Sequence, residues 1–267
     1  MHAYDSLSRS VFLPLFTRPR YPESQLRPSW LKRHPELRLL FSLAALCVSF
    51  ALQANNLEPS GQQTSSSQTT NQPADNPLYA MQNLQQRWAE IKYRLPQKQQ
   101  QAALEQLSNL ASQYLNEYPQ TPELLIWRGV ILSTYAGIKG GLSALSLVNQ
   151  AKESFEQALE INPDALSGSA YTSLGALYYQ APGWPISFGN DKKARELLEK
   201  ALKIDPYGID SNYFYADFLV SQKDFMLAHK ALDKALLAPD RPNRTLADEG
   251  RRQEIINLLS KIGDKHS

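Results

Sequence analysis

The chain has 267 residues, and its charge is unevenly distributed. Residues 1–54 hold seven of the 28 Lys and Arg residues and three of the 26 Asp and Glu residues, which leaves 21 basic and 23 acidic residues in 55–267. The longer part is near neutral and has no basic stripe, which argues against nucleic acid as a partner. The only cysteine, Cys47, lies in the shorter part, so 55–267 has no thiol for a disulfide, a metal site or a nucleophile.

Residues 1–54 have the order of a bacterial secretory signal. A basic region that includes Lys32, Arg33 and Arg38 precedes an apolar stretch that ends at the small residue Ala54. With about 1.5 Å per residue, that stretch is shorter than the roughly 30 Å of a hydrocarbon core. We therefore predict export to the periplasm with cleavage after Ala54. The alternative is an uncleaved signal that anchors the chain in the inner membrane and is its sole contact with the membrane.

A lipoprotein signal and a linker are the other features before the folded region. Residues 43–47 resemble a lipobox that ends at Cys47, but Leu46 is larger than the residue that such a signal requires before its cysteine. Residues 55–77 are mostly Gln, Ser, Thr, Asn and Pro, which bury too little apolar area to fold. We divide the chain into a basic region and signal at 1–54, a disordered polar linker at 55–77 and a folded region at 78–267.

The folded region repeats a pattern of small, apolar and small residues followed by proline. The three copies are Ala151, Phe155, Ala158 and Pro163; Ala194, Leu198, Ala201 and Pro206; and Ala228, Leu232, Ala235 and Pro239. Small residues at these positions allow a second helix to approach closely, and proline ends a helix. A helix is predicted before each copy, and before the second copy it carries Tyr171, Leu174, Gly175 and Tyr178. The pattern predicts a series of helical hairpins.

These positions resemble the pattern of the tetratricopeptide repeat family over roughly residues 98–240. The resemblance implies an all-α superhelix of helical hairpins that binds a partner and does not catalyse a reaction. We also expect a divergent fourth hairpin that pairs 77–94 with 97–117. A final helix over 245–262 is expected to cap the stack with a polar outer face.

Two hairpins carry insertions between their paired helices. The corresponding small positions of the two helices are 12 residues apart in the third hairpin, 19 in the second and 22 in the first. Both insertions, near 137–150 and 180–190, are predicted to lie on one edge of the stack, where repeat proteins often bind. The second insertion has two interpretations: Trp184, Ile186 and Phe188 either seal the groove between hairpins or form the aromatic wall of a pocket.

Helical register predicts which residues face the inner side of the stack. The inward positions on the first helices of the three hairpins are Ile126, Val130, Ser133, Thr172, Ala176, Tyr179, Tyr213, Asp217 and Val220. The first eight of these, with Trp184 and Phe188, are the predicted partner-binding residues. A groove of apolar and hydroxyl side chains favours a peptide or an amphipathic ligand over a strongly anionic one.

Signals for catalysis are missing from the sequence. The histidines after residue 54 are His229 and His266, and the chain has no i, i+4 His pair, no nucleophile elbow and no phosphate-binding glycine loop. We therefore expect no enzymatic activity, no metal and no cofactor.

Two functions remain open at this point. The leading hypothesis is a periplasmic scaffold that binds a protein or peptide partner in the cell envelope. Residues 185–194 also resemble the T-component of tripartite ATP-independent periplasmic transporters, which implies a small hydrophobic ligand and a solute-binding partner.

Overall fold

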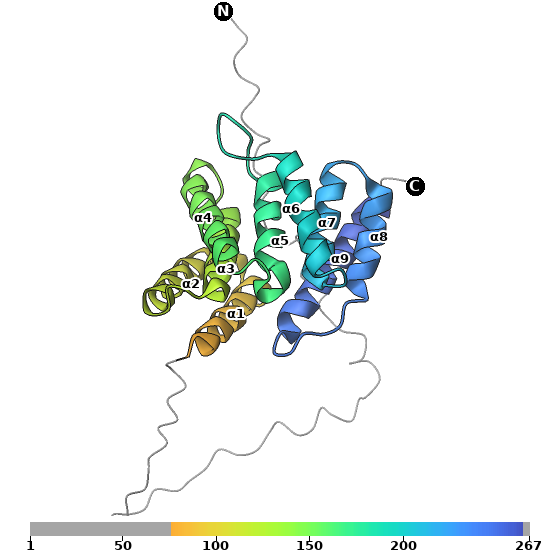
Figure 1. The fold of residues 1–267 in the computed structure, drawn as a ribbon. Helices are drawn as coiled ribbons and strands as arrows, with labels where there is room; N and C mark the ends of the chain where they lie inside the picture. Colours follow the sequence, from red (N-terminus) through yellow and green to blue (C-terminus); the bar gives the residue numbers. More distant parts are fainter. Residues whose placement is uncertain (1–75, 264–267) are drawn as a thin grey trace, which may run out of the picture. The chain divides into compact units, whose positions relative to one another are not determined.

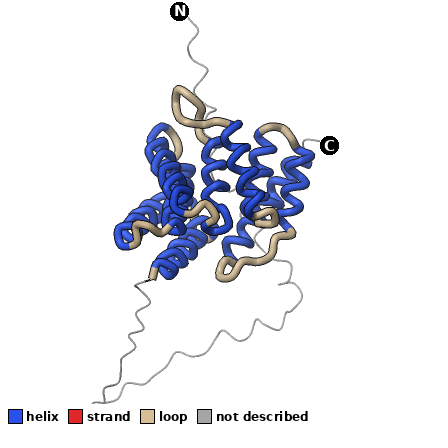
Figure 2. Tube along the Cα trace, in the orientation of Figure 1, coloured by secondary structure: helices blue, strands red, loops and turns tan. Residues whose placement is uncertain are grey.

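The computed structural model describes residues 76–263, which form helices joined by loops (Figure 1, Figure 2). The predicted secretory signal lies outside the described residues, as does the linker up to residue 75. Within the described range no helix is long and apolar enough to cross a membrane. The helices are α1 (Pro77–Tyr93), α2 (Gln97–Glu117), α3 (Pro122–Lys139), the short 3-10 helix η4 (Leu142–Ala144), α4 (Leu145–Ile161), α5 (Ala165–Gln180), α6 (Asp191–Ile204), α7 (Ile209–Ser221), α8 (Phe225–Leu236) and α9 (Thr245–Gly263).

The first helix begins within the last two residues of the predicted linker. The side-chain oxygen of Asn76 accepts a hydrogen bond from the backbone N–H of Leu78 at 2.9 Å, and Pro77 occupies the first turn. This is a favourable N-terminal cap, because proline has no N–H to satisfy there. The first described helix therefore begins at Pro77, one residue before the predicted start of the folded region.

Successive helices pair as hairpins and pack against the next hairpin. Helix α3 packs on α4, α5 on α6 and α7 on α8, while α2 contacts α3, α4 contacts α5 and α6 contacts α7. The expected fourth hairpin is formed by α1 and α2. The all-α stack of helical hairpins is thereby confirmed. The loops that join α3 to α4, α5 to α6 and α7 to α8 lie at the upper edge of the view in Figure 1.

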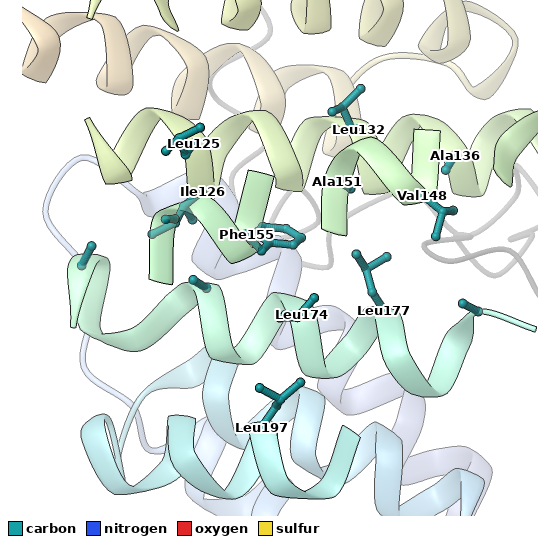
Figure 3. Close-up of a cluster of buried hydrophobic side chains, with 14 of the residues drawn as sticks. Leu125, Ile126, Leu132, Ala136, Val148, Ala151, Phe155, Leu174, Leu177 and Leu197 are labelled. Atoms are coloured by element: carbon teal, nitrogen blue, oxygen red, sulfur yellow. The ribbon is translucent and has the colours of Figure 1, made fainter. Parts of the chain in front are cut away.

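Each hairpin is held by a bulky side chain against a residue with little or no side chain. A Cβ atom on Gly129 would lie 2.4 Å from the ring of Phe155, and one on Gly175 would lie 2.8 Å from Leu198. Phe155 and its neighbours from α3 and α5 form one buried cluster, shown in Figure 3. The small residues of the repeat pattern, which make this approach possible, are all fully buried: Ala151, Ala158, Ala194, Ala201, Ala228 and Ala235.

The final helix does more than cover the last hairpin. Helix α9 packs on α7 and α8, as expected of a capping helix, and it also contacts α1. The Lys92 ammonium of α1 lies 2.9 Å from a carboxylate oxygen of Glu254 on α9. The two ends of the described chain therefore meet on one side of the stack, where α1, α3, α5 and α7 lie. We call this the inner side of the stack.

Candidate functional site: a pocket on the inner side of the hairpin stack

A pocket with a volume of about 430 Å³ lies where these helices converge. Its walls come from α1, α3, α4, α5, α7 and α9 and from the loop 241–244 before α9. Pockets for small molecules typically have volumes of roughly 300–1,000 Å³. The pocket is therefore large enough for a small amphipathic molecule or a few residues of a peptide.

Most of the pocket wall is apolar and aromatic. Trp88 and Trp127 meet edge to face with ring centroids 5.6 Å apart, and the indole N–H of Trp88 donates to Thr134 at 2.9 Å. These contacts hold the two rings in place. The other apolar residues of the wall are Met81, Ile126, Val130, Phe155, Leu166, Ala176, Leu177 and Phe214.

Hydroxyl groups on the wall are partly engaged by backbone carbonyls. Ser133 donates to the carbonyl of Gly129 at 2.7 Å, and Ser169 donates to that of Leu166 at 2.6 Å. Hydroxyl groups bonded in this way are less available to bind a polar ligand.

The backbone at Leu166 and Ser167 is left-handed, with φ of 48° and 55°, and both residues line the pocket. Such conformations cost of order 1–3 kcal/mol each in residues other than glycine, so this wall is strained.

One end of the pocket is ionic. Asp210 on α7 accepts hydrogen bonds from Arg251 at 2.8 Å and from Arg241 at 2.7 Å. Burial by itself would raise the pKa of Asp210, but the guanidinium groups of Arg251 and Arg241, together with that of Arg244, hold it well below its usual range. Arg241 also donates to Asp248 on α9, at 2.9 Å from both its Nε and its backbone N–H. These bonds fix the loop before α9 against α7.

A buried ion pair joins α1 to α9 beside this end. Lys92, 4% exposed, pairs with Glu254, and Arg251 pairs with the same carboxylate. Burial lowers the pKa of Lys92, and Glu254 partly opposes that shift. Burial raises the pKa of Glu254, but Lys92 and Arg251 outweigh it and lower the pKa overall. The contact between the chain ends therefore depends on charges that must be ionised together.

Five of the residues predicted from helical register line this pocket. They are Ile126, Val130, Ser133, Thr172 and Ala176. Tyr179 and Asp217 do not line it: the Tyr179 hydroxyl donates to Asp217 at 2.6 Å, and burial raises the pKa of Asp217. The ring of Tyr213 lies 4.3 Å from the guanidinium of Arg251. Whether any of these residues binds a partner stays a prediction.

Apart from Gln180 at its start, the insertion at 180–190 does not line this pocket. Trp184 is 90% exposed and Ile186 is 53% exposed, so neither seals a groove nor lines the cavity. Phe188 packs edge to face on Tyr178 with centroids 5.2 Å apart, near Lys152 of α4. The interpretation as a seal between hairpins thus holds for Phe188 alone. The loop turns back on itself through a bridge between Gly183 and Gly189, which leaves Trp184 pointing away from the core.

The packing of a bulky side chain of each second helix onto Gly129 or Gly175 decides the fold type. The fold is a tetratricopeptide-like stack of helical hairpins. No protein-family model and no curated protein matches the sequence. The chain is similar in structure to yeast Tom70, with 17% identity and a TM-score of 0.45, over 73% of this chain and 34% of that one. It is also similar in structure to MamA, with 19% identity and a TM-score of 0.37, over 63% of this chain and 92% of that one.

The chain thus spans about a third of the length of Tom70. At these identities and scores, neither similarity carries a conclusion about function. The tetratricopeptide-like fold supplies a scaffold, and the pocket has to be interpreted from its own residues.

Helical register did not predict two groups of residues that line the pocket. Met81 and Trp88 come from α1, and Arg241, Arg244 and Arg251 come from the loop before α9 and from α9 itself. The arginine-rich run near residues 241–252 was a visible signal, but it places charge at the pocket only because α9 crosses from α8 to α1. No local sequence pattern predicts a contact of this kind between the two ends of the described chain.

The described residues show no group of three or more His, Cys, Asp or Glu side chains that could hold a metal ion. His229 is exposed on α8, where its Nδ1 lies 3.0 Å from Asp233 one turn along the same helix. This is an ordinary i, i+4 surface pair, and His229 does not line the pocket.

Proposed function

We propose that this protein is a non-catalytic binding module that takes up an apolar segment of a protein partner. The observation that carries the proposal is the pocket of about 430 Å³, whose wall is mainly apolar and aromatic and lies on the inner side of the stack. Aromatic side chains provide large contact area at low cost in conformational entropy, so they suit peptide recognition.

We place this function in the periplasm. Support comes from the basic region, apolar stretch and small residue Ala54 at the N-terminus, which have the order of an export signal. The partner would then be a protein of the cell envelope. Fractionation of cells, with sequencing of the N-terminus of the purified protein, tests both the compartment and the cleavage after Ala54.

A second candidate function is the capture of a small hydrophobic ligand, as for a T-component-like accessory of a transporter. The size of the pocket favours it, because a volume of about 430 Å³ suits a short ligand better than a long extended peptide. In this case the ligand would be released to, or accepted from, a solute-binding partner.

A pocket-filling variant tests the binding function. Val130 lies on the wall of the pocket, and Val220 is a half-buried valine on α7 that does not line it. We would select peptides from a displayed random library against the wild-type protein, and then measure their binding to Val130→Trp and Val220→Trp. Binding should be lost in Val130→Trp and retained in Val220→Trp, with both variants checked for helix content and melting temperature.

Decanol, a neutral apolar probe, distinguishes the two candidates. If decanol binds in a Val130-dependent manner and no peptide does, the small-ligand function is supported. If neither peptides nor decanol show binding that Val130→Trp removes, the proposed function is wrong.

A further inference from the structure

Two nitrogen donors on the pocket wall have no acceptor. The indole Nε1 of Trp127 and the side-chain Nε of Arg244 are both buried without a hydrogen-bond partner among the described residues. Both residues line the pocket, and Trp127 is 4% exposed. The guanidinium carbon of Arg244 lies 5.0 Å from the centre of the Trp127 ring, so the two side chains that carry these donors are neighbours.

The neighbouring carboxylates are already occupied. Asp210 accepts from Arg251 and Arg241, one on each oxygen, and both oxygens of Asp248 accept from Arg241. Glu254 accepts from Lys92 and Arg251 in the same way. Arg244 makes no ion pair within residues 76–263, and burial is the main cause that lowers its pKa. Asp210 and Asp248 oppose this shift, but neither pairs directly with Arg244.

The buried Nε–H of Arg244 is costly to leave without an acceptor. The guanidinium cannot lose its charge, and the neighbouring residues supply no acceptor for this N–H. The adjacent indole N–H also needs an acceptor. An oxyanion with two oxygens would satisfy both donors at once, and a planar carboxylate matches the geometry of a guanidinium best.

We propose that Arg244 and Trp127 bind a carboxylate carried by the pocket's occupant, whose apolar part lies against the aromatic wall. This proposal rests on the proposed function, because it concerns the chemistry of what the pocket takes up. It also changes the preference that the register argument predicted, since the inward residues of α3, α5 and α7 include no arginine. The carboxylate could belong to a free amphipathic acid or to a peptide, and the experiment separates these sources.

The experiment compares decanoate with decanol, which have the same chain length and differ in the anionic group. In a second arm, a peptide selected on the wild-type protein is compared as its free C-terminal acid and as its amide. Titration calorimetry of the purified full chain should give decanoate, the peptide acid or both an affinity about tenfold or more above that of the neutral counterpart. The arm that shows the preference identifies the source.

Arg244→Gln should remove this preference, leaving the binding of decanol unchanged. Arg195→Gln is the matched control, because its guanidinium also lies 5.0 Å from an aromatic ring, that of Phe218, and does not line the pocket. Trp127→Phe keeps a ring and removes only the N–H, so it should reduce the preference by a smaller factor. It also tests the proposal if Arg244→Gln does not fold.

Two results would overturn the carboxylate site. One is equal affinity for acid and neutral probes in both arms, with Val130→Trp still blocking them, which leaves the binding function intact. The other is a preference for the acid that survives in both Arg244→Gln and Trp127→Phe.

Discussion

Two kinds of contact build the pocket, and they differ in chemistry and in sequence range. The hairpin contacts are apolar and local: Phe155 fills the space over Gly129 about 26 residues away in the chain, and Leu198 fills that over Gly175. The contact between the ends of the described chain is distant, and it adds the buried ion pair of Lys92 on α1 and Glu254 on α9 to the close packing of Gly250 on Tyr93. Steric fit therefore determines the stack, while steric fit and charge pairing together close it.

This difference has a functional consequence. The contacts within each hairpin do not involve α9, whereas the pocket also needs the loop 241–244 and Arg251. Buried ion pairs contribute little net stability but are very sensitive to the loss of one partner. The closed end is thus the part of the molecule that mutation or acid should open first.

Removal of the ring of Phe155 should have the largest effect. Phe155 is fully buried against Gly129, so Phe155→Ala leaves a cavity and should lower the free energy of unfolding by about 3–5 kcal/mol. Urea denaturation followed by circular dichroism measures this loss. Ile161→Ala, at a position 40% exposed on the same helix, is the control and should cost less than about 1 kcal/mol. Equal losses in the two variants would contradict the steric account.

Removal of one partner from the closing ion pair should have the next largest effect. Glu254→Gln leaves the ammonium of Lys92 without its carboxylate, and we expect a loss of about 3 kcal/mol in the same unfolding measurement. The double variant Lys92→Met with Glu254→Leu should recover part of the loss, because it removes the unpaired ammonium while Arg251 keeps its bond to Asp210. A double variant as unstable as Glu254→Gln would show that the pair is not the cause.

Acid should weaken the closed end by a smaller amount. The folded-state pKa values of Asp210 and Glu254 lie below the usual 3.8 and 4.5, so the unfolded chain takes up protons first as the pH falls. The free energy of unfolding should therefore decrease as the pH is lowered through these values. Asp217 opposes this trend, because its pKa is raised and protonation favours the folded state.

Two variants separate these contributions to the acid response. Asp210→Asn should make the decrease in stability with falling pH shallower, and Asp217→Asn should make it steeper. Denaturant titrations at several pH values measure both slopes. Identical slopes in the two variants would show that these carboxylates do not control the acid response.

The smallest effect is expected at the exposed loop. Trp184 is 90% exposed, so Trp184→Ala should change the free energy of unfolding by no more than about 0.5 kcal/mol and leave pocket binding unchanged. Thermal unfolding and decanol titration check the two statements. Loss of partner binding in this variant would restore the loop as the binding face, as the sequence had suggested.

Local spacing was sufficient to predict much of the fold. The small residues at Ala151, Ala194 and Ala228 are fully buried as required, and the divergent hairpin at 77–117 and the final helix are present near their predicted bounds. These features depend on the helical period alone, so five of the inward positions could also be placed on the pocket wall. The insertion at 180–190 was harder, because an apolar composition does not say whether a loop folds onto the core or away from it.

The sequence by itself thus determined the hairpins, because the periodic spacing of small and bulky residues places Phe155 over Gly129 and Leu198 over Gly175. Only the tertiary structure decided that α9 reaches α1, and with it which residues complete the pocket. The physical reason is that ion pairs such as Lys92 with Glu254 join positions that no helical repeat relates. Which charged residues meet depends on the path of the whole chain. The same path leaves the Nε of Arg244 without a hydrogen-bond partner among the described residues.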